Sequence, residues 1–371
     1  MTSTTNQDLD MKVSEEFFYL NNSNYENEHE IEKSQKYISS VLTPYFEVFS
    51  QSYLSSSVTF CVTGSDGRNE NIRSKELPGS DLEFVVILDK KESHEVVTNL
   101  MKQLIDSVNT ESMRVNGVNF IDSDVEYRAL DEEENALFYY GWGKKELFPT
   151  RAFDLKYVWG SSSIYQKYAD KISSDIQKVK SLAPFQKTRI KPVRSQLSQA
   201  LAGDHPNVSW NLDDGTASIH YNPEEKQLGT KTIILRPMQY YLARQLFEAF
   251  KKKQISVPVH ELPKSLESRL HYLSNENLLF LPGEKGKIYP ASEEDVGRYA
   301  RAYQKGLYIH NNLKSEQRKT RNTASVTVNA SEFRELLETV QEFSDTNKGL
   351  RVQSQVAKKA PRKVRNHSNK T

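Results

Sequence analysis

Two acidic residues, Asp81 and Glu83, are the residues of this chain best suited to hold a divalent cation. Side chains at positions i and i+2 of a β-strand leave the same face of the sheet, so the two carboxylates would lie side by side. Two such charges in contact repel each other by about 4 kcal/mol at an effective dielectric constant of about 20. A Mg²⁺ ion relieves that repulsion, and it prefers one or two carboxylates together with substrate phosphate oxygens. The pair therefore predicts a metal site that also takes a phosphate.

A glycine-rich turn precedes the acidic pair and would supply the phosphate-binding side. Gly64 and Gly67 allow a tight turn and a close approach of the backbone to a ligand, and Ser65 is a good cap for a following helix. Free backbone N–H groups at such a turn suit a phosphate. Arg68 either binds a triphosphate oxygen through its planar guanidinium or braces the loop together with Glu70. Turn and acidic pair together predict a nucleotide–metal site.

Two predicted strands must position the turn and the pair. Val58, Phe60 and Val62 alternate with smaller or polar residues, and residues 84–88 form a continuous apolar run. Both patterns are typical of strands. The glycine turn follows the first predicted strand, and the acidic pair opens the second.

The combined motif resembles that of the nucleotidyltransferase superfamily, which has a polymerase-beta-like fold. It is similar to the branch that contains the uridylyltransferase domain of the PII-modifying enzyme and bacterial relatives of unassigned role. The matching residues are Gly64-Ser65-x-Gly67-Arg68-x-Glu70 and Ser80-Asp81-x-Glu83. The resemblance covers residues 30–250 approximately. The interval between the two motifs is longer than in the family, with an insertion at residues 75–79.

Transfer chemistry on a nucleotide needs a third carboxylate, because the acceptor hydroxyl must be deprotonated by a metal or a nearby base. Asp154 is the candidate, since residues 153–160 resemble the Asp-x-Arg-x-x-x-Gly segment of the same branch, with Lys156 in place of the arginine. We expect Asp154 to lie within a strand over residues 150–158, where a metal or Lys156 would satisfy its charge. Three rival acids alternate along another predicted strand face: Asp122, Asp124 and Glu126.

The resemblance implies a Mg²⁺-dependent (or Mn²⁺-dependent) nucleotidyltransferase that uses a nucleoside triphosphate such as ATP. Such an enzyme moves a nucleoside monophosphate to an acceptor hydroxyl on a protein, a small molecule or an RNA, and releases pyrophosphate. The implied metal ligands and catalytic residues are Asp81, Glu83 and Asp154. The candidate donor-binding residues are Gly64, Ser65, Gly67, Arg68, Ser80, Lys156 and Lys231. The alternative is a non-catalytic nucleotide-binding or regulatory module on the same fold.

Further cations cluster at the start of a helix predicted over residues 186–201. They would either balance the charge of a triphosphate or form a solvated basic face. Lys231, which follows a Gly-Thr pair, is open to the same two interpretations. The cations of the predicted helix are Lys187, Arg189, Lys191 and Arg194.

The amino-acid composition narrows the classes of protein to which this chain could belong. Its net charge of +1 at neutral pH gives no overall attraction to nucleic acid or membranes. The single Cys61 excludes an intrachain disulfide and fits a reducing, cytoplasmic compartment. We expect no membrane-spanning helix, because no apolar run approaches about 18 residues. The polar N-terminus does not have the pattern of a signal peptide, although non-classical secretion would escape this test.

The order of predicted elements indicates an α+β protein, with a nucleotidyltransferase-like mixed sheet and flanking helices followed by an α-helical domain. The predicted divisions are a disordered tail (1–14), the catalytic domain (15–182), the helical domain (183–345) and a basic disordered tail (346–371) that would suit anionic partners. We expect a polar loop over residues 203–229. Apolar spacing predicts helices over 96–108, 163–179, 186–201, 237–251, 266–281, 295–313 and 330–343.

Overall fold

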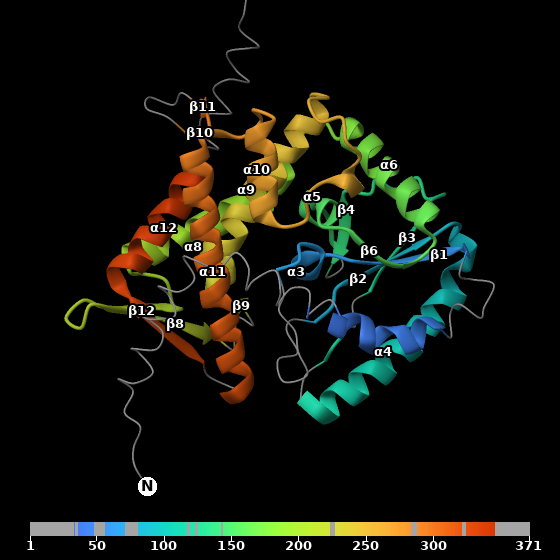
Figure 1. The fold of residues 1–371 in the computed structure, drawn as a ribbon, viewed down its shortest axis with the longest axis horizontal. Coiled ribbons are helices and arrows are strands. Elements are labelled where there is room, and N and C mark those ends of the chain that lie inside the picture. Colours follow the sequence, from blue (N-terminus) through green and yellow to red (C-terminus); the bar gives the residue numbers. More distant parts are fainter. Residues whose placement is uncertain are drawn as a thin grey trace, which may run out of the picture.

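The computed structural model describes residues 33, 36–47, 56–70, 81–116, 119–122, 125–141, 144–222, 227–282, 288–320 and 324–345. They form a mixed fold of helices and short sheets (Figure 1). Both predicted tails, and the candidates Ser80 and Asp124, lie outside the described residues.

A four-stranded sheet with the order β3-β2-β1-β6 forms the centre of the N-terminal half. The strands are β1 (Val58–Val62), β2 (Phe84–Leu88), β3 (Glu126–Ala129) and β6 (Lys156–Gly160). β1 pairs antiparallel with β2 and β6, whereas β3 runs parallel to β2. The mixed sheet and the two strands predicted from apolar patterns are therefore confirmed.

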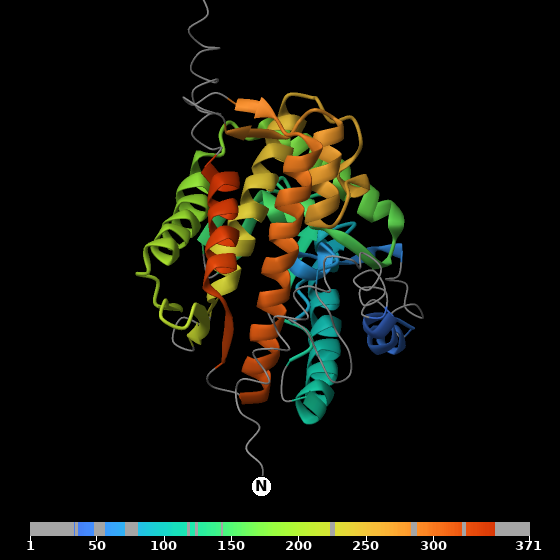
Figure 2. The ribbon, with the colours of Figure 1, turned by 60° about the vertical axis from the view of Figure 1, so that its left-hand side comes forward.

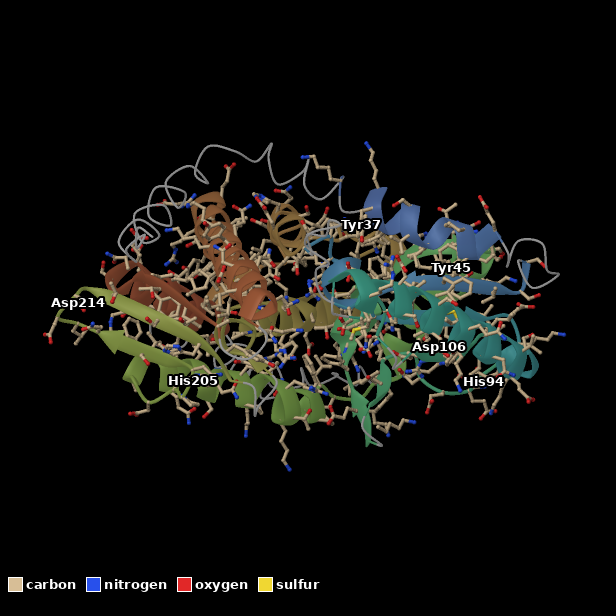
Figure 3. The ribbon with its side chains drawn as sticks, turned by 90° about the horizontal axis from the view of Figure 1, so that it is seen from below. Tyr37, Tyr45, His94, Asp106, His205 and Asp214 are labelled. Carbon is tan, nitrogen blue, oxygen red and sulfur yellow. The ribbon has the colours of Figure 1, made fainter. Side chains whose placement is uncertain are left out.

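The two faces of this sheet meet different cores. Phe60 and Val62 pack with α4 (His94–Asn116) and with helical residues 36–47. Figure 3 shows that helical segment, which carries Tyr37 and Tyr45, beside α4 with His94 and Asp106. Cys61 and the other strand residues whose side chains point to the opposite side of the sheet face α6 (Ser162–Lys178) and the C-terminal half. This second face is the one from which a strand residue reaches the C-terminal helices.

The segment before β6 differs from the predicted strand over residues 150–158. Residues 149–153 form a short helix, α5 (Pro149–Phe153), and the strand begins only at Lys156. Proline at the first helical position is pre-organised for a helix, which explains the start. A hairpin of β4 (Phe138–Gly141) and β5 (Lys144–Leu147) precedes it. The prediction that Asp154 lies mid-strand is therefore wrong, because it caps the end of α5.

The C-terminal half is built around helices that stand side by side, with α9, α11 and α12 adjacent in Figure 2. Its helices are α7 (Ala183–Phe185), α8 (Lys191–Ala202), α9 (Arg236–Lys251), α10 (Leu266–Asn275), α11 (Glu293–Thr320) and α12 (Ala330–Asp345). One buried core runs from Cys61 in β1 to Phe343 in α12, so the two halves share their interior. None of the helices in the described part of the chain combines the length and apolarity needed to cross a bilayer.

This half also contains strands, so the expectation of helices alone is wrong. One sheet has the order β12-β8-β7, with β9 beside β8, and a separate hairpin joins β10 to β11. Ala217 and Ile219 are fully buried and alternate with polar residues along β8, a pattern that the polar composition of residues 203–229 conceals. The strands are β7 (Val208–Asn211), β8 (Thr216–Asn222), β9 (Gln227–Leu228), β10 (Phe280–Pro282), β11 (Ile288–Pro290) and β12 (Ser325–Asn329).

Two helices of the C-terminal half are entered through a π-helical turn. These turns are η3 (Gln186–Ile190) before α8 and η4 (Lys231–Leu235) before α9. In each, the N–H that follows the turn donates to a carbonyl five residues back, and a proline comes next: Pro192 or Pro237. Proline clashes with the carbonyl four residues back in a regular helix, and the wider turn relieves that clash. The α-helix α9 thus begins near Pro237 as predicted, at Arg236, and the π-helical turn extends it back to Lys231.

Candidate nucleotide and metal site

The glycine turn lies against the acidic strand at one end of the central sheet. The Thr63 N–H donates to the Glu83 carbonyl at 3.0 Å, which extends the pairing of β1 with β2. Gly64 has a φ of +66°, and a Cβ added there would lie 3.1 Å from Glu83 Oε2. Glycine suits this position because it accepts a positive φ and leaves room for the neighbouring carboxylate. The turn and one of the predicted metal ligands are therefore in direct contact.

The turn itself is a single helical turn, α3 (Gly64–Gly67), which Figure 1 shows at the end of the central sheet on the side that faces the C-terminal helices. Ser65 lies inside this turn and does not cap it, so the predicted capping role is wrong. The N–H of Gly67 makes the first bond of the turn, to Thr63, at 3.3 Å. The N–H groups of the residues before Gly67 are at the start of the helical turn, where N–H groups have no hydrogen-bond partner within the helix. Glycine is needed at position 67 for a different reason. A Cβ there would overlap the Asp154 carbonyl oxygen.

The acidic pair faces the C-terminal half. Leu82 points into the core beneath α4, so its neighbours Asp81 and Glu83 leave the opposite side. Asp81 is exposed and Glu83 is half-buried, with Arg151 Nη1 3.6 Å from Glu83 Oε2. Sequence reasoning missed Arg151, since no motif marks it and only the short helix α5 brings it there.

Asp122, one of the rival acids, lies beside Glu83. Leu82 and Ile121 form a parallel bridge, in which the Asp122 N–H donates to the Leu82 carbonyl at 2.9 Å. Residues opposite each other in a parallel pair share a face, so Asp122 leaves the sheet on the same side as Glu83. The structure therefore brings Asp122 next to the acidic pair.

Asp154 has a different environment from the acidic pair. It is 2% exposed, and each of its carboxylate oxygens accepts from an arginine: Oδ1 from Arg269 Nη1 at 2.6 Å, and Oδ2 from Arg68 Nη1. The expected pairing with Lys156 is not formed, since Lys156 Nζ donates to Asn69 Oδ1 at 2.6 Å. Burial lowers the pKa of Lys156. Two guanidinium groups thus already balance the charge that a metal was expected to balance.

Arg68 lies in the protein interior. It is 7% exposed, and its Nε donates to Glu70 Oε2 at 2.6 Å while Nη1 binds Asp154. Burial alone would lower the pKa of Arg68, but the two carboxylates hold that pKa well above its ordinary value. Of the two interpretations left open by the sequence, this geometry matches a guanidinium that braces the loop.

The remaining rival, Glu126, is held by arginines. Arg128 Nη2 binds Glu126 Oε1, and Arg151 Nε lies 3.2 Å from Glu126 Oε2. The Arg151 guanidinium also covers the Tyr139 ring, 4.1 Å from its centroid. Arg151 therefore stands between Glu83 and Glu126, and its positive charge offsets the repulsion between these two acids.

Lys231 is brought to the acidic pair by the π-helical turn η4. Its ammonium is half-buried, and it forms no hydrogen bond or ion pair with any residue that the structure describes. Burial and the neighbouring Arg236 lower the pKa of Lys231, whereas the charges of Glu83 and Asp81 act in the opposite direction. The C-terminal half thus presents a cation to the two acids.

A buried histidine that the sequence did not single out lies behind Lys231. His310 Nδ1 and Thr230 Oγ1 are hydrogen-bonded at 2.8 Å, and both residues are buried. Burial holds the pKa of His310 well below its ordinary value, and the charges of Lys314, Lys231 and Arg236 lower it further. His310 is therefore neutral at physiological pH, and no signal at metal-ligand spacing marked it in the sequence.

The cations at the start of α8 are placed differently from Lys231. Lys187 and Lys191 are exposed, and Arg189 binds Glu146 of β5 while covering the Phe148 ring at 4.7 Å from its centroid. Lys187 and Lys191 therefore match the solvated basic face that the sequence left open as one of two interpretations, whereas Arg189 is held against β5.

The oxygen-rich set around Glu83 suits Mg²⁺ in its chemistry, since that ion prefers carboxylates supplemented by phosphate and water. Within the described ranges, however, no three or more His, Cys, Asp or Glu side chains are grouped closely enough to hold a metal ion. A complete metal site would therefore need oxygens from a bound phosphate or a closer approach of these acids.

Comparison of the chain with protein-family models and with curated proteins gives no match. The relation to nucleotidyltransferases thus stays a resemblance carried by the two motifs.

Proposed function

We propose that this protein is a Mg²⁺-dependent nucleotidyltransferase that moves a nucleoside monophosphate from a nucleoside triphosphate to an acceptor hydroxyl. The observation that supports this most is the contact between the glycine turn and the acidic strand, in which the absence of a side chain at Gly64 leaves room for the Glu83 carboxylate. A phosphate held at the turn would lie next to any metal held by that carboxylate. Acceptors of three kinds are open: a protein side chain, a small molecule or an RNA end.

In the proposed site, Asp81, Glu83 and Asp122 would approach one another more closely and hold the metal together with phosphate oxygens of the bound nucleotide. Asp122 replaces Asp154 as the third carboxylate of this proposal, because it neighbours Glu83 across the parallel bridge while Asp154 binds two arginines. When bound, Mg²⁺ supplies charge neutralisation at the phosphates and makes the acceptor hydroxyl more acidic.

The residues of the chain would orient the donor from two sides. Backbone N–H groups at Gly64 and Ser65 bind phosphate oxygens, and Lys231 balances their charge from the C-terminal half. The acceptor oxygen forms a bond to the α-phosphorus as the bond from that phosphorus to the bridging oxygen breaks. Pyrophosphate leaves, and the hydroxyl proton passes to a carboxylate, for which Asp122 is our candidate.

Transfer of label from nucleotides tests this proposal. The protein is incubated with a cell lysate, Mg²⁺ and each nucleoside triphosphate labelled at the α-phosphate, and label is sought on protein, RNA and small molecules. We expect Asp81→Asn to abolish the transfer, because the variant removes one metal ligand. Asp106→Asn is the matched control, since it changes an exposed acid of α4 on the other face of the sheet. Full transfer by Asp81→Asn would overturn the proposed metal site.

A non-catalytic nucleotide-binding module is the competing outcome. A ligand at about 100 times its Kd stabilises the folded state by about 2.7 kcal/mol, which a thermal melt detects. Stabilisation that needs both nucleotide and Mg²⁺, without any transfer of label, would favour the binding module over the enzyme.

A further inference from the structure

A buried chain of alternating charges joins the glycine turn to the C-terminal helices. It runs from Glu70 through Arg68 and Asp154 to Arg269, with one ion pair at each step. All four side chains are less than a tenth exposed. Two acids and two arginines make the chain neutral, so each charge depends on its neighbours for compensation.

Arg269 of α10 anchors the far end of this chain. Besides the bond to Asp154, its Nη2 donates to the Phe153 carbonyl at 2.7 Å and its Nε to the Pro263 carbonyl at 2.8 Å. All three nitrogens of the guanidinium are therefore in use, and the side chain is 5% exposed. A guanidinium group that makes this many hydrogen bonds fixes the end of α5 in position and orientation.

The end of α5 in turn fixes the glycine turn. The Asp154 carbonyl oxygen lies so close to Gly67 that no Cβ would fit between them. The Asp154 carboxylate binds Arg68, the residue that follows α3 directly. Backbone contact and ion pair together mean that a shift of Asp154 moves the turn.

Helix α11 lies near the other end of this chain. The Tyr303 hydroxyl accepts from Gln239 Nε2 at 2.7 Å, and the charge of Glu70 adds to burial in holding the pKa of Tyr303 well above its ordinary value. Within the described residues, Glu70 Oε1 has no hydrogen-bond partner, so Tyr303 does not hold Glu70 in the way that Arg269 holds Asp154. Burial raises the pKa of Glu70, and Arg68 opposes that rise.

From these contacts we infer that the C-terminal half holds the glycine turn in its binding conformation, with Arg269 as the positioning residue that acts through Asp154. Arg269 lies outside the acidic pair and the turn, so it shapes the site without contributing a ligand. The nucleotide part of the inference rests on the proposed function, whereas the effect on the turn does not.

Hydrogen exchange of the full-length protein tests the effect on the turn. In Arg269→Met we expect the amides of residues 64–70 to exchange at least about tenfold faster, which equals about 1.4 kcal/mol of lost protection. Tyr303→Phe keeps the ring and should change the same amides in the same direction by less. Unchanged exchange at these amides in Arg269→Met would overturn the inference.

Two control variants show whether the loss of any arginine or tyrosine contact in the C-terminal half has the same effect. Arg298→Met removes another arginine of the C-terminal half, whose Nη1 and Nη2 bind Glu342 at 2.7 and 2.9 Å. Tyr299→Phe removes a hydroxyl from the same helix as Tyr303, one that binds Glu342 at 3.1 Å. We expect both controls to leave the amides of residues 64–70 unchanged. Equal effects in controls and test variants would also overturn the inference.

Nucleotide affinity gives the second measurement. If the wild type binds Mg²⁺ and ATP, Arg269→Met should raise the Kd by about tenfold, while Arg298→Met leaves it unchanged. In the background of Asp154→Asn, Arg269→Met should add little, because both changes act through the same carboxylate. Absence of ATP binding by the wild type would contradict the proposed function, and the exchange experiment would still decide the positioning role.

Discussion

Two acidic sites of this protein are the pair Asp81 and Glu83 and the single Asp154. The sequence predicts the same metal-binding role for both sites, but their surroundings in the structure differ. The pair lies at the end of the sheet, where Asp81 is exposed and an arginine nitrogen is 3.6 Å from Glu83. Asp154 is buried between two guanidinium groups. An exposed acid can be reached by a cation from solvent, whereas the charge of a buried acid between two arginines is already balanced. Burial and the presence of counter-charges therefore distinguish Asp154 from the acidic pair, although the sequence motifs suggest one shared role.

The difference has an energetic consequence. Breaking a buried ion pair by removing one partner costs about 3–5 kcal/mol, because a charge is left without compensation in the interior. Changes at exposed acids usually stay within about 0.5 kcal/mol of the wild type. The same substitution at the two positions should therefore act on different properties, stability in one case and activity in the other.

The largest expected effect concerns Asp154. We expect Asp154→Asn to lower the free energy of unfolding by about 3–5 kcal/mol, because Arg68 and Arg269 both lose their shared carboxylate. Asp81→Asn should leave that free energy within about 0.5 kcal/mol of the wild type. Urea denaturation of the two variants measures both values. Equal losses of stability in the two variants would contradict the difference described between Asp154 and Asp81.

Gly67 gives the next largest effect. We expect Gly67→Ala to cost about 3 kcal/mol, because the new methyl group meets the Asp154 carbonyl oxygen and the turn must move. Gly297→Ala in α11 is the control, since its nearest neighbour is the flexible end of Arg301 at 3.3 Å. Alanine is favoured over glycine inside a helix by about 0.5–1 kcal/mol, so this control should not lose stability. Thermal melts compare the two, and a stable Gly67→Ala would contradict the described contact.

Lys231 and Lys187 extend the comparison from acids to cations. Both lie in a π-helical turn, but Lys231 is half-buried near the acidic pair and Lys187 is exposed. We expect Lys231→Met to weaken the binding of ATP with Mg²⁺ by about tenfold, or about 1.4 kcal/mol, whereas Lys187→Met has no effect. Calorimetric titration measures both affinities. A larger loss for Lys187 would show that the phosphate side of the site lies elsewhere.

The smallest effect is a shift in titration next to Asp154. Lys264 Nζ donates to the Leu155 carbonyl at 3.1 Å, and burial together with Arg269 lowers the pKa of Lys264 to about 8. An amine with a lowered pKa is neutral, and so nucleophilic, above that value. Its acylation rate should therefore level off above about pH 8, well below the ordinary lysine pKa of about 10.4. Mass spectrometry of acylated peptides follows this rate, and a rate that keeps rising up to about pH 10 would contradict the described surroundings.

Local patterns were enough to predict the elements that carry the proposed site. The apolar alternation of Val58 to Val62 and the run of residues 84–88 predicted β1 and β2, and helical spacing predicted α4, α6 and α12 in approximate extent. These signals lie within single elements, where the period of side-chain burial follows from backbone geometry alone. The antiparallel pairing of β1 with β2 then brings Gly64 to Glu83.

The partners of Asp154 were beyond such reasoning. Arg68 and Arg269 lie 86 and 115 positions away along the chain, and no periodicity links residues so far apart. The strand predicted around Asp154 failed for a local reason, since Pro149 starts a helical turn there. The strands of residues 203–229 were missed because β8 buries one small residue, Ala217, where a strand signal usually has a large one.

The π-helical turn η4 also constrains the length of the chain. Such a turn holds one residue more than the corresponding α-helical turn, so the segment 231–235 behaves like a one-residue insertion in a regular helix. Deleting a residue there would rotate everything before it by about 100° about the helix axis. Lys231 would swing away from the acids, and Pro237 would again press on a carbonyl. Variation among natural versions of this helix should therefore exchange side chains freely but preserve the count of residues between Lys231 and Pro237.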